Sequence, residues 1–137
     1  MDDQKDNKMK LWLQLAAVYN LLWGASVVLF PKLQFEVFDM EYPRYMGFWQ
    51  CVGMIVGVYG LGYWWASRDP LKHWPIVAVG LIGKICGPIG FAEAIFTGKL
   101  PLIFGINIIF NDIIWWPSFF LIMLRARKKA KFEGKWP

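Results

Sequence analysis

Hydrophobic residues in this sequence are gathered into four long runs separated by short polar segments. The runs cover about residues 11–30, 45–67, 74–96 and 102–124. Each is close to the roughly 20 residues that a helix needs to cross about 30 Å of hydrocarbon. Backbone groups in lipid must form hydrogen bonds within their own segment, so each run is predicted to be a helix. The pattern predicts one all-α domain over residues 1–137, an integral membrane four-helix transmembrane bundle.

The polar segments predict how the helices are connected. Residues 97–101 are so few that the last two helices are expected to form an antiparallel hairpin. Residues 31–44 form the longest connection, and its stretch "LQFEVFDM" is expected to lie in the membrane interface as a short helix. The mixed charges of "MDDQKDNK" and the lack of an A-x-A site indicate that the first run is retained rather than cleaved as a signal.

The sign of the charges in these segments predicts an orientation. Both ends ("KDNKMK" and "RARKKAK") and the connection "SRDPLKHW" are basic, whereas "PKLQFEVFDMEYPR" is acidic on balance. Basic segments stay on the cytoplasmic side of a membrane. We therefore expect both termini in the cytoplasm and the protein in a bacterial cytoplasmic (inner) membrane.

The composition is typical of a membrane protein, and the basic tail predicts contact with anionic lipid headgroups. Hydrophobic residues make up 57% of the chain and charged residues 18%, against about 25% charged residues in soluble domains. The net charge is +5, and much of it lies in the tail 125–137. Such a cluster attracts anionic lipid headgroups, at about 1 kcal/mol per basic residue, and retention at the membrane explains it without nucleic-acid binding. The basic residues of the tail are Arg125, Arg127, Lys128, Lys129, Lys131 and Lys135.

Two charged residues are predicted to lie near the bilayer midplane. Lys84 and Asp112 are each about ten residues from the end of a run, which is roughly 15 Å in a helix, and Asn20 falls near the same plane. A lone charge there costs at least about 2.5–3.5 kcal/mol, so charges in membranes usually face the bundle interior and pair. We expect Lys84 and Asp112 to form a buried ion pair between neighbouring helices.

More polar groups are expected around this pair. Pro88 and Pro117 cannot donate the helical hydrogen bond to the carbonyl four residues earlier, which frees the carbonyls of Lys84 and Ile113. Asn111 and Asn107 lie one turn apart beside Asp112. Together with Asn20, Lys84 and Gln50, they outline a polar centre that either fixes helix register through hydrogen bonds or binds a ligand or ion.

Glycines form stripes at helical spacing on the second and third runs. Small residues let helices approach closely in a membrane. The favoured explanation is packing of the second helix against the third, and the alternatives are a homodimer seam or the wall of a ligand pocket. The stripes are Gly53, Gly57 and Gly60, and Gly80, Gly83, Gly87 and Gly90.

Motifs of known enzymes are absent. Cys51 and Cys86 form no C-x-x-C pair and are expected to be two buried thiols. His73 is the only histidine, which argues against a metal or haem site. There is no nucleophile elbow, P-loop or H-E-x-x-H. We therefore assign no catalytic residue, cofactor or metal.

Three phrases resemble those of an uncharacterised family of small bacterial four-helix membrane proteins. They are "YNLLWGASVVLFP", "HWPIVAVGLIGKICGPIGF" and "NDIIWWPSFF", from three of the four runs. In size and topology the chain also resembles, loosely, the DoxX-like group. The resemblance implies a helical bundle and carries no activity or site residue.

Three classes of function are left. The preferred one is a non-enzymatic subunit or scaffold of a larger membrane assembly, which meets a protein partner or a second copy through its glycine stripes. The second is a small transporter, monomeric or dimeric, in which Lys84 and Asp112 couple protons or grip a substrate. The third is a protein or enzyme that binds a lipid or quinone, with Asp112 as acid–base and Asn107 and Asn111 as orienting groups.

Overall fold

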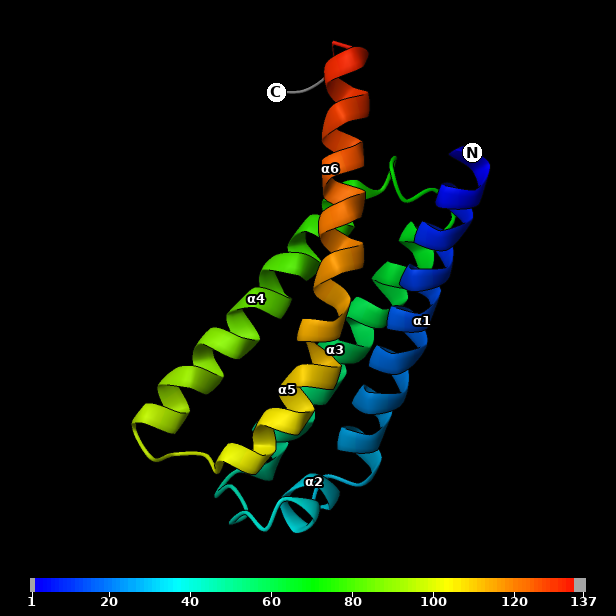
Figure 1. Cartoon of the computed structure of the whole chain (residues 1–137). Helices are drawn as coiled ribbons and strands as arrows, with labels where there is room; N and C mark the ends of the chain where they lie inside the picture. Colours follow the sequence, from blue (N-terminus) through cyan, green and yellow to red (C-terminus); the bar gives the residue numbers. More distant parts are fainter. Residues whose placement is uncertain (1, 135–137) are drawn as a thin grey trace.

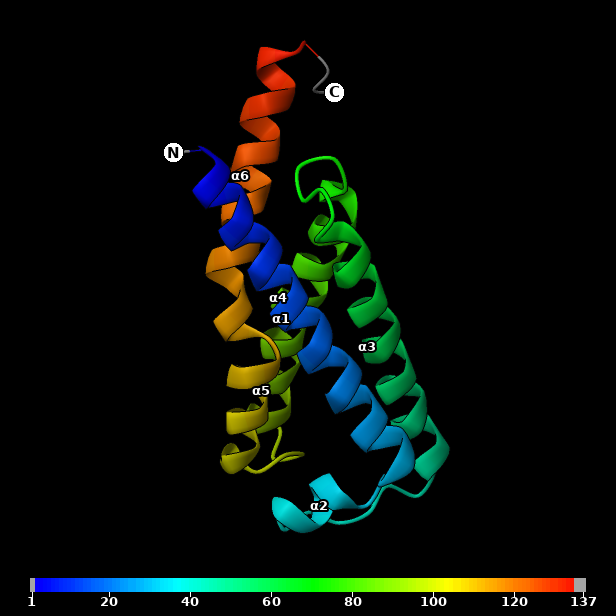
Figure 2. The same ribbon diagram turned by 90° about the vertical axis from the view of Figure 1, so that its right-hand side faces the viewer.

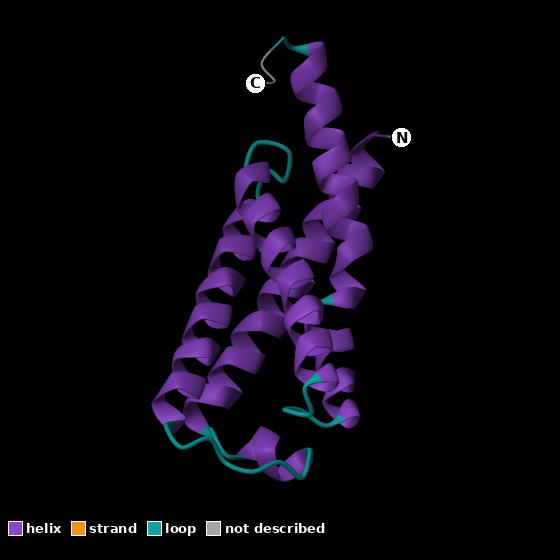
Figure 3. Cartoon of the chain, turned by 90° about the vertical axis from the view of Figure 1, so that its left-hand side faces the viewer, coloured by secondary structure: helices purple, strands orange, loops and turns teal. Residues whose placement is uncertain are grey.

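The computed structural model describes residues 2–134, and that part of the chain forms helices and connections with no β-strand (Figure 3). The predicted all-α class is confirmed. The long helices are α1 (Asp2–Leu29), α3 (Met46–Ala66), α4 (Trp74–Phe96) and α6 (Trp116–Phe132), and the short ones are α2 (Leu33–Val37), the 3₁₀ helix η1 (Leu102–Phe104), α5 (Gly105–Asn111) and the 3₁₀ helix η2 (Ile113–Trp115).

Three helical stretches in the described residues are long and apolar enough to cross a membrane. They are Gln4–Leu29, Trp74–Phe96 and Leu102–Phe132. Helix α3 is not among them, because its glycines, tyrosines and tryptophans lower its mean hydropathy. Large apolar side chains are exposed along all the long helices, which a soluble monomer rarely allows. The surface is compatible with an integral membrane protein, and the count of four spans stays a prediction.

The fourth predicted run differs most from expectation. A continuous helix over residues 102–124 is wrong, because the chain turns at Asp112 (φ −122°, ψ −62°) between α5 and η2. Helix α6 then continues to Phe132, so most of the predicted tail is helical. Lys135 lies outside the described residues. The third run agrees with α4 at both ends.

The helices run up and down between two ends of the molecule. The N-terminus, the C-terminus and the α3–α4 connection lie at one end, and α2 and the α4–η1 connection lie at the other (Figures 1 and 2). Helices α4 and α5 form the predicted antiparallel hairpin. Which end faces the cytoplasm stays a prediction.

The apolar core lies in the half of the bundle that is nearest the termini. Leu13, Tyr63, Val77, Phe119 and Ile122 are buried there and come from α1, α3, α4 and α6. Burial of such side chains from four helices fixes this half of the molecule. The other half holds the break at Asp112.

The glycine stripe of α3 packs against α1. A Cβ atom at Gly24 would lie 2.5 Å from the carbonyl oxygen of Gly53 and 2.9 Å from the backbone nitrogen of Gly57. A Cβ atom at Gly60 would lie 2.9 Å from the carbonyl oxygen of Ala17. The predicted packing of the second helix on the third is therefore wrong for the α3 stripe, which faces α1, whereas Gly80 of the α4 stripe does lie against Tyr63 of α3.

This close approach predicts different effects of two alanine substitutions. Gly24→Ala pushes a methyl group onto the α3 backbone and is expected to destabilise the protein by about 1–3 kcal/mol. Gly57→Ala is the control, because a Cβ atom there meets nothing within 4 Å and alanine favours a helix. Thermal unfolding in detergent measures both. Equal melting temperatures for the two variants would contradict the packing.

Candidate functional site

A polar cavity of about 230 Å³ lies in the middle of the bundle, next to the apolar core. Four elements contribute to it: α1, α3, α4 and the break after α5. Of the residues that the sequence predicts to form a polar centre, four line this cavity. The polar side chains around it are Asn20, Tyr59, Tyr63, Lys84, Asn111 and Asp112.

Lys84 binds the end of α5. Its side chain is only 4% exposed, and its Nζ donates a hydrogen bond to the backbone carbonyl of Asn111 at 2.6 Å. Carbonyls at a helix end lack partners within the helix and carry partial negative charge, so a cation is favourable there. The ammonium also lies 5.7 Å from the centroid of the Tyr63 ring and 6.0 Å from that of Trp115. These contacts offset part of the cost of burying the charge.

The carbonyl that Pro88 frees is also used. The indole Nε1 of Trp116 donates to the carbonyl oxygen of Lys84 at 3.0 Å, which is the acceptor that a proline four residues later leaves open. Lys84 thus donates to the chain before the break and accepts from the chain after it. The carbonyl of Ile113, which Pro117 was predicted to free, accepts the backbone N–H of Trp116.

The predicted ion pair between Lys84 and Asp112 is not formed. The ion pairs within 4.0 Å in the described residues are Lys99–Glu93 at 2.8 Å and Arg125–Asp6 at 3.6 Å. The physical reason is the break, because it ends α5 and offers the ammonium a backbone carbonyl. Lys84 and Asp112 therefore line one cavity as separate charges.

Asp112 packs against α4 at Gly87, where the lack of a side chain leaves room for its carboxylate. It is 5% exposed, and a Cβ atom at Gly87 would collide with its carboxylate oxygen Oδ2. Its other oxygen, Oδ1, accepts a long hydrogen bond of 3.4 Å from Asn111 Nδ2. The Gly87 position of the stripe thus makes room for Asp112.

Two amide oxygens in the cavity have no hydrogen-bond partner. Asn20 is 3% exposed, and its Nδ2 donates to the carbonyl of Val56 at 3.3 Å, which leaves Oδ1 buried and unpartnered. Asn111 is oriented by its bond to Asp112, and its Oδ1 is likewise unpartnered. Buried polar atoms usually have partners, so these two oxygens can each accept a hydrogen bond from a water or a ligand in the cavity.

Two predicted members lie elsewhere. Gln50 donates to the carbonyl of Val28 at 2.9 Å, and Asn107 accepts from the indole of Trp23 at 3.0 Å. Both bonds join helices, as register-fixing groups do. Glu93 lies in an exposed ion pair with Lys99.

Sequence reasoning missed the aromatic part of the site. Tyr59 and Tyr63 are one turn apart in the second apolar run, and this spacing, which places two hydroxyls on one inner face, was the available signal. A Cβ atom at Gly80 would collide with the Tyr63 hydroxyl. Two glycines of the α4 stripe therefore lie against polar side chains of neighbouring elements: Gly80 against Tyr63 and Gly87 against Asp112.

Other features carry less chemistry. Cys51 and Cys86 are free and exposed, so the expected burial of both thiols is wrong, because both point outward from their helices. No group of three metal-binding side chains lies within the residues that the structure describes.

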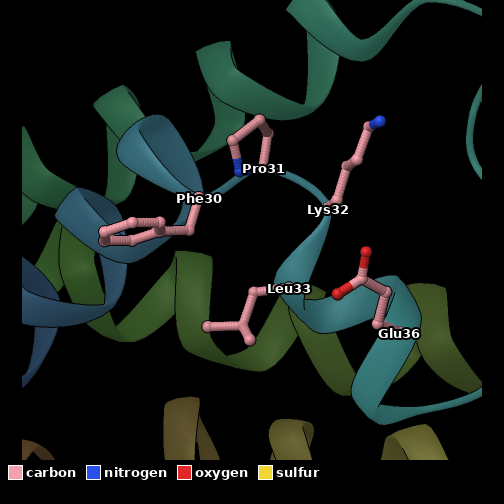
Figure 4. A pocket seen from close by; sticks show the side chains of 5 residues that line it. All are labelled: Phe30, Pro31, Lys32, Leu33 and Glu36. Carbon is pink, nitrogen blue, oxygen red and sulfur yellow. The ribbon is translucent and has the colours of Figure 1, made fainter.

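A larger hollow of about 600 Å³ lies where α1 turns into α2. There Phe30 and Leu33 present apolar side chains, and the charged end of Lys32 points away from them (Figure 4). Glu36 accepts from the Tyr42 hydroxyl at 2.9 Å, which raises the pKa of Tyr42. This hollow has no buried polar group, so the polar cavity lined by Lys84 and Asp112 is the better candidate.

Comparison of the chain with protein-family models, with curated proteins and with solved structures finds no match. The resemblance to small bacterial four-helix membrane proteins stays a prediction. The site therefore has to be interpreted from its own geometry.

The contact between Gly87 and Asp112 predicts an energetic coupling. Gly87→Ala is expected to cost about 1–3 kcal/mol, because its methyl group displaces the carboxylate. In an Asp112→Ala background most of this cost should vanish, with a coupling of about 0.5–3 kcal/mol. Gly83→Ala is the matched control on α4, where a Cβ atom meets nothing within 4 Å. Unfolding in detergent measures the cycle, and additive effects would show that the two residues do not touch.

Proposed function

We propose that this chain is an integral membrane protein that binds the polar head of a lipophilic molecule in its midplane cavity. It has four spans, both termini in the cytoplasm, and lies in a bacterial cytoplasmic membrane. Among the three classes, this is the lipid- or quinone-binding one, and binding rather than catalysis is proposed. The membrane-compatible helices and the apolar surface support the setting.

One observation carries the proposal: the cavity leaves polar groups unused that a structural lock would satisfy. A polar centre built only for packing is stable when every member has its partners. Here Lys84 and Asp112 do not pair, and Asn20 and Asn111 each keep a buried oxygen without a partner. These unused hydrogen-bonding groups favour a cavity that binds a ligand.

The size of the cavity favours a head group over a whole ligand. Pockets for drug-sized molecules measure about 300–1,000 Å³, whereas this one measures about 230 Å³. A small head fits among the polar side chains, and the rest of the molecule stays among the lipids. This favours a lipophile over a water-soluble transport substrate.

The basic end of the molecule is proposed to contact anionic lipid headgroups. A cleft of about 790 Å³ lies there between α1 and α6. Each basic side chain near an anionic surface contributes about 1 kcal/mol. Arg127 lies on the same helix outside the cleft, and Arg125 also meets Asp6 at 3.6 Å. The basic residues that line the cleft are Lys5, Arg125, Lys128, Lys129 and Lys131.

Extraction in mild detergent followed by mass spectrometry of bound small molecules tests the proposal. Wild-type protein is expected to hold a lipophile at up to one molecule per chain. Asn20→Leu is expected to lose most of it while folding normally, because leucine removes a buried unpartnered oxygen. Gln50→Leu is the control, since Gln50 is polar but lies outside the cavity.

The other classes predict different results in the same preparation. A stable protein partner with no bound lipophile would favour a subunit or scaffold. Proton-dependent flux in proteoliposomes, lost in Asp112→Asn, would favour a transporter. Either result without a bound lipophile would overturn the proposal.

A further inference from the structure

Resting on the proposed function, we propose that the ligand enters the cavity from the hydrocarbon, between α3 and α4, and that its head is an uncharged hydroxyl group. The first part concerns the opening of the cavity. The second concerns the hydrogen bonds that the cavity can still make.

The lining of the cavity has a buried floor and an exposed rim. Asn20, Lys84 and Asp112 are at most 5% exposed and form the floor. Ile55 of α3 is 58% exposed, and Gly83 of α4 is exposed as well. The cavity therefore opens sideways, between α3 and α4.

The rim lies at mid-height on both helices. Ile55 is the tenth residue of the 21 in α3, counting from Met46, and Gly83 is the tenth of the 23 in α4, counting from Trp74. At 1.5 Å per residue, each is roughly 15 Å from the helix end. In a membrane of about 30 Å, the opening faces acyl chains rather than water.

On either side of the cavity along the bundle, apolar and aromatic side chains pack between the helices. Towards the termini lies the apolar core with Val77 and Phe119. Towards the other end, the Trp23 indole donates to Asn107 and packs edge-on against Trp49, with ring centroids 5.8 Å apart.

Glycine keeps this opening clear. A Cβ atom at Gly83 would meet nothing within 4 Å, so the glycine leaves open space at the rim that a larger side chain would fill. Gly90 lies about two helical turns further along α4. A Cβ atom there would also meet nothing within 4 Å, but Gly90 does not line the cavity. The two positions form a matched pair for a blocking experiment.

The cavity offers both donors and acceptors: the Lys84 ammonium, with three N–H groups, and the Tyr59 and Tyr63 hydroxyls line it beside the amide and carboxylate oxygens. The amide nitrogens of Asn20 and Asn111 are engaged with Val56 and Asp112, and both amide oxygens are acceptors without a partner. The carboxylate of Asp112 adds further acceptor sites. A head that both donates and accepts fits this mixture, whereas one with only carbonyl or ether oxygens would leave the amide and carboxylate oxygens without a donor.

The charges in the cavity favour an uncharged donor. One buried ammonium and one buried carboxylate already balance, so a charged head would bring an uncompensated charge into a site of low polarity. A hydroxyl donates without adding charge. Phenols, quinols and long-chain alcohols share this chemistry.

Photo-crosslinking in lipid nanodiscs tests both parts. The probes are dodecan-1-ol with a diazirine at carbon 6 and its methyl ether, which differ in the hydroxyl donor. The alcohol is expected to label residues around Ile55 and Gly83 about fivefold more than the ether, the size expected for one buried hydrogen bond. Gly83→Leu should reduce alcohol labelling to the ether level, and Gly90→Leu should leave it unchanged.

Each contrary result has its own meaning. Equal labelling by alcohol and ether, still lost in Gly83→Leu, would overturn the hydroxyl head. Labelling that survives Gly83→Leu would overturn the lateral opening. Neither result touches the proposed function, which fails if no lipophile co-purifies with the wild type and Asn20→Leu behaves as Gln50→Leu does.

Discussion

The cost of burying the ammonium group of Lys84 is the constraint on which the middle of this molecule depends. A charge in the centre of a bundle needs strong, close partners. The chain supplies such a partner by ending α5 at Asn111. The backbone carbonyl of Asn111 accepts a hydrogen bond from the ammonium at 2.6 Å. Pro88 then opens the carbonyl of Lys84 itself to the Trp116 indole at 3.0 Å. The two bonds tie α4 to both sides of the break, so the break and the buried lysine stabilise each other.

The cavity is a consequence of this arrangement. Because the ammonium binds a backbone carbonyl, the carboxylate of Asp112 is left beside it in the space that Gly87 provides. Asn20 reaches the same space from α1 and uses only its amide nitrogen there. A polar site thus forms at mid-height without a pair of charges to seal it. Such a site suits a small head group that arrives with an apolar body.

The sequence predicts the helical class and the grouping of four polar residues well, and the contacts between helices less well. Hydropathy locates α4 to the residue, because a membrane-length helix needs one unbroken apolar run. It places Lys84 and Asp112 in one cavity. It misses the break at Asp112, since an apolar run does not report backbone continuity. It also pairs the α3 glycines with the wrong helix, because a stripe shows that a neighbour is close without showing which one, and α1 is the neighbour through Gly24.

The central claim is that Lys84 and Asp112 are separate charges in one cavity. Solid-state NMR of the protein in lipid bilayers tests it most directly, by dipolar coupling between ¹⁵Nζ-lysine and ¹³C-labelled asparagine backbone carbonyls or aspartate carboxyl carbons. The account predicts a short coupling to an asparagine carbonyl that disappears in Lys84→Met, and no aspartate coupling that depends on Lys84. A strong coupling to an aspartate carboxyl carbon that is lost in Lys84→Met would contradict it, since the cavity would then hold a closed ion pair.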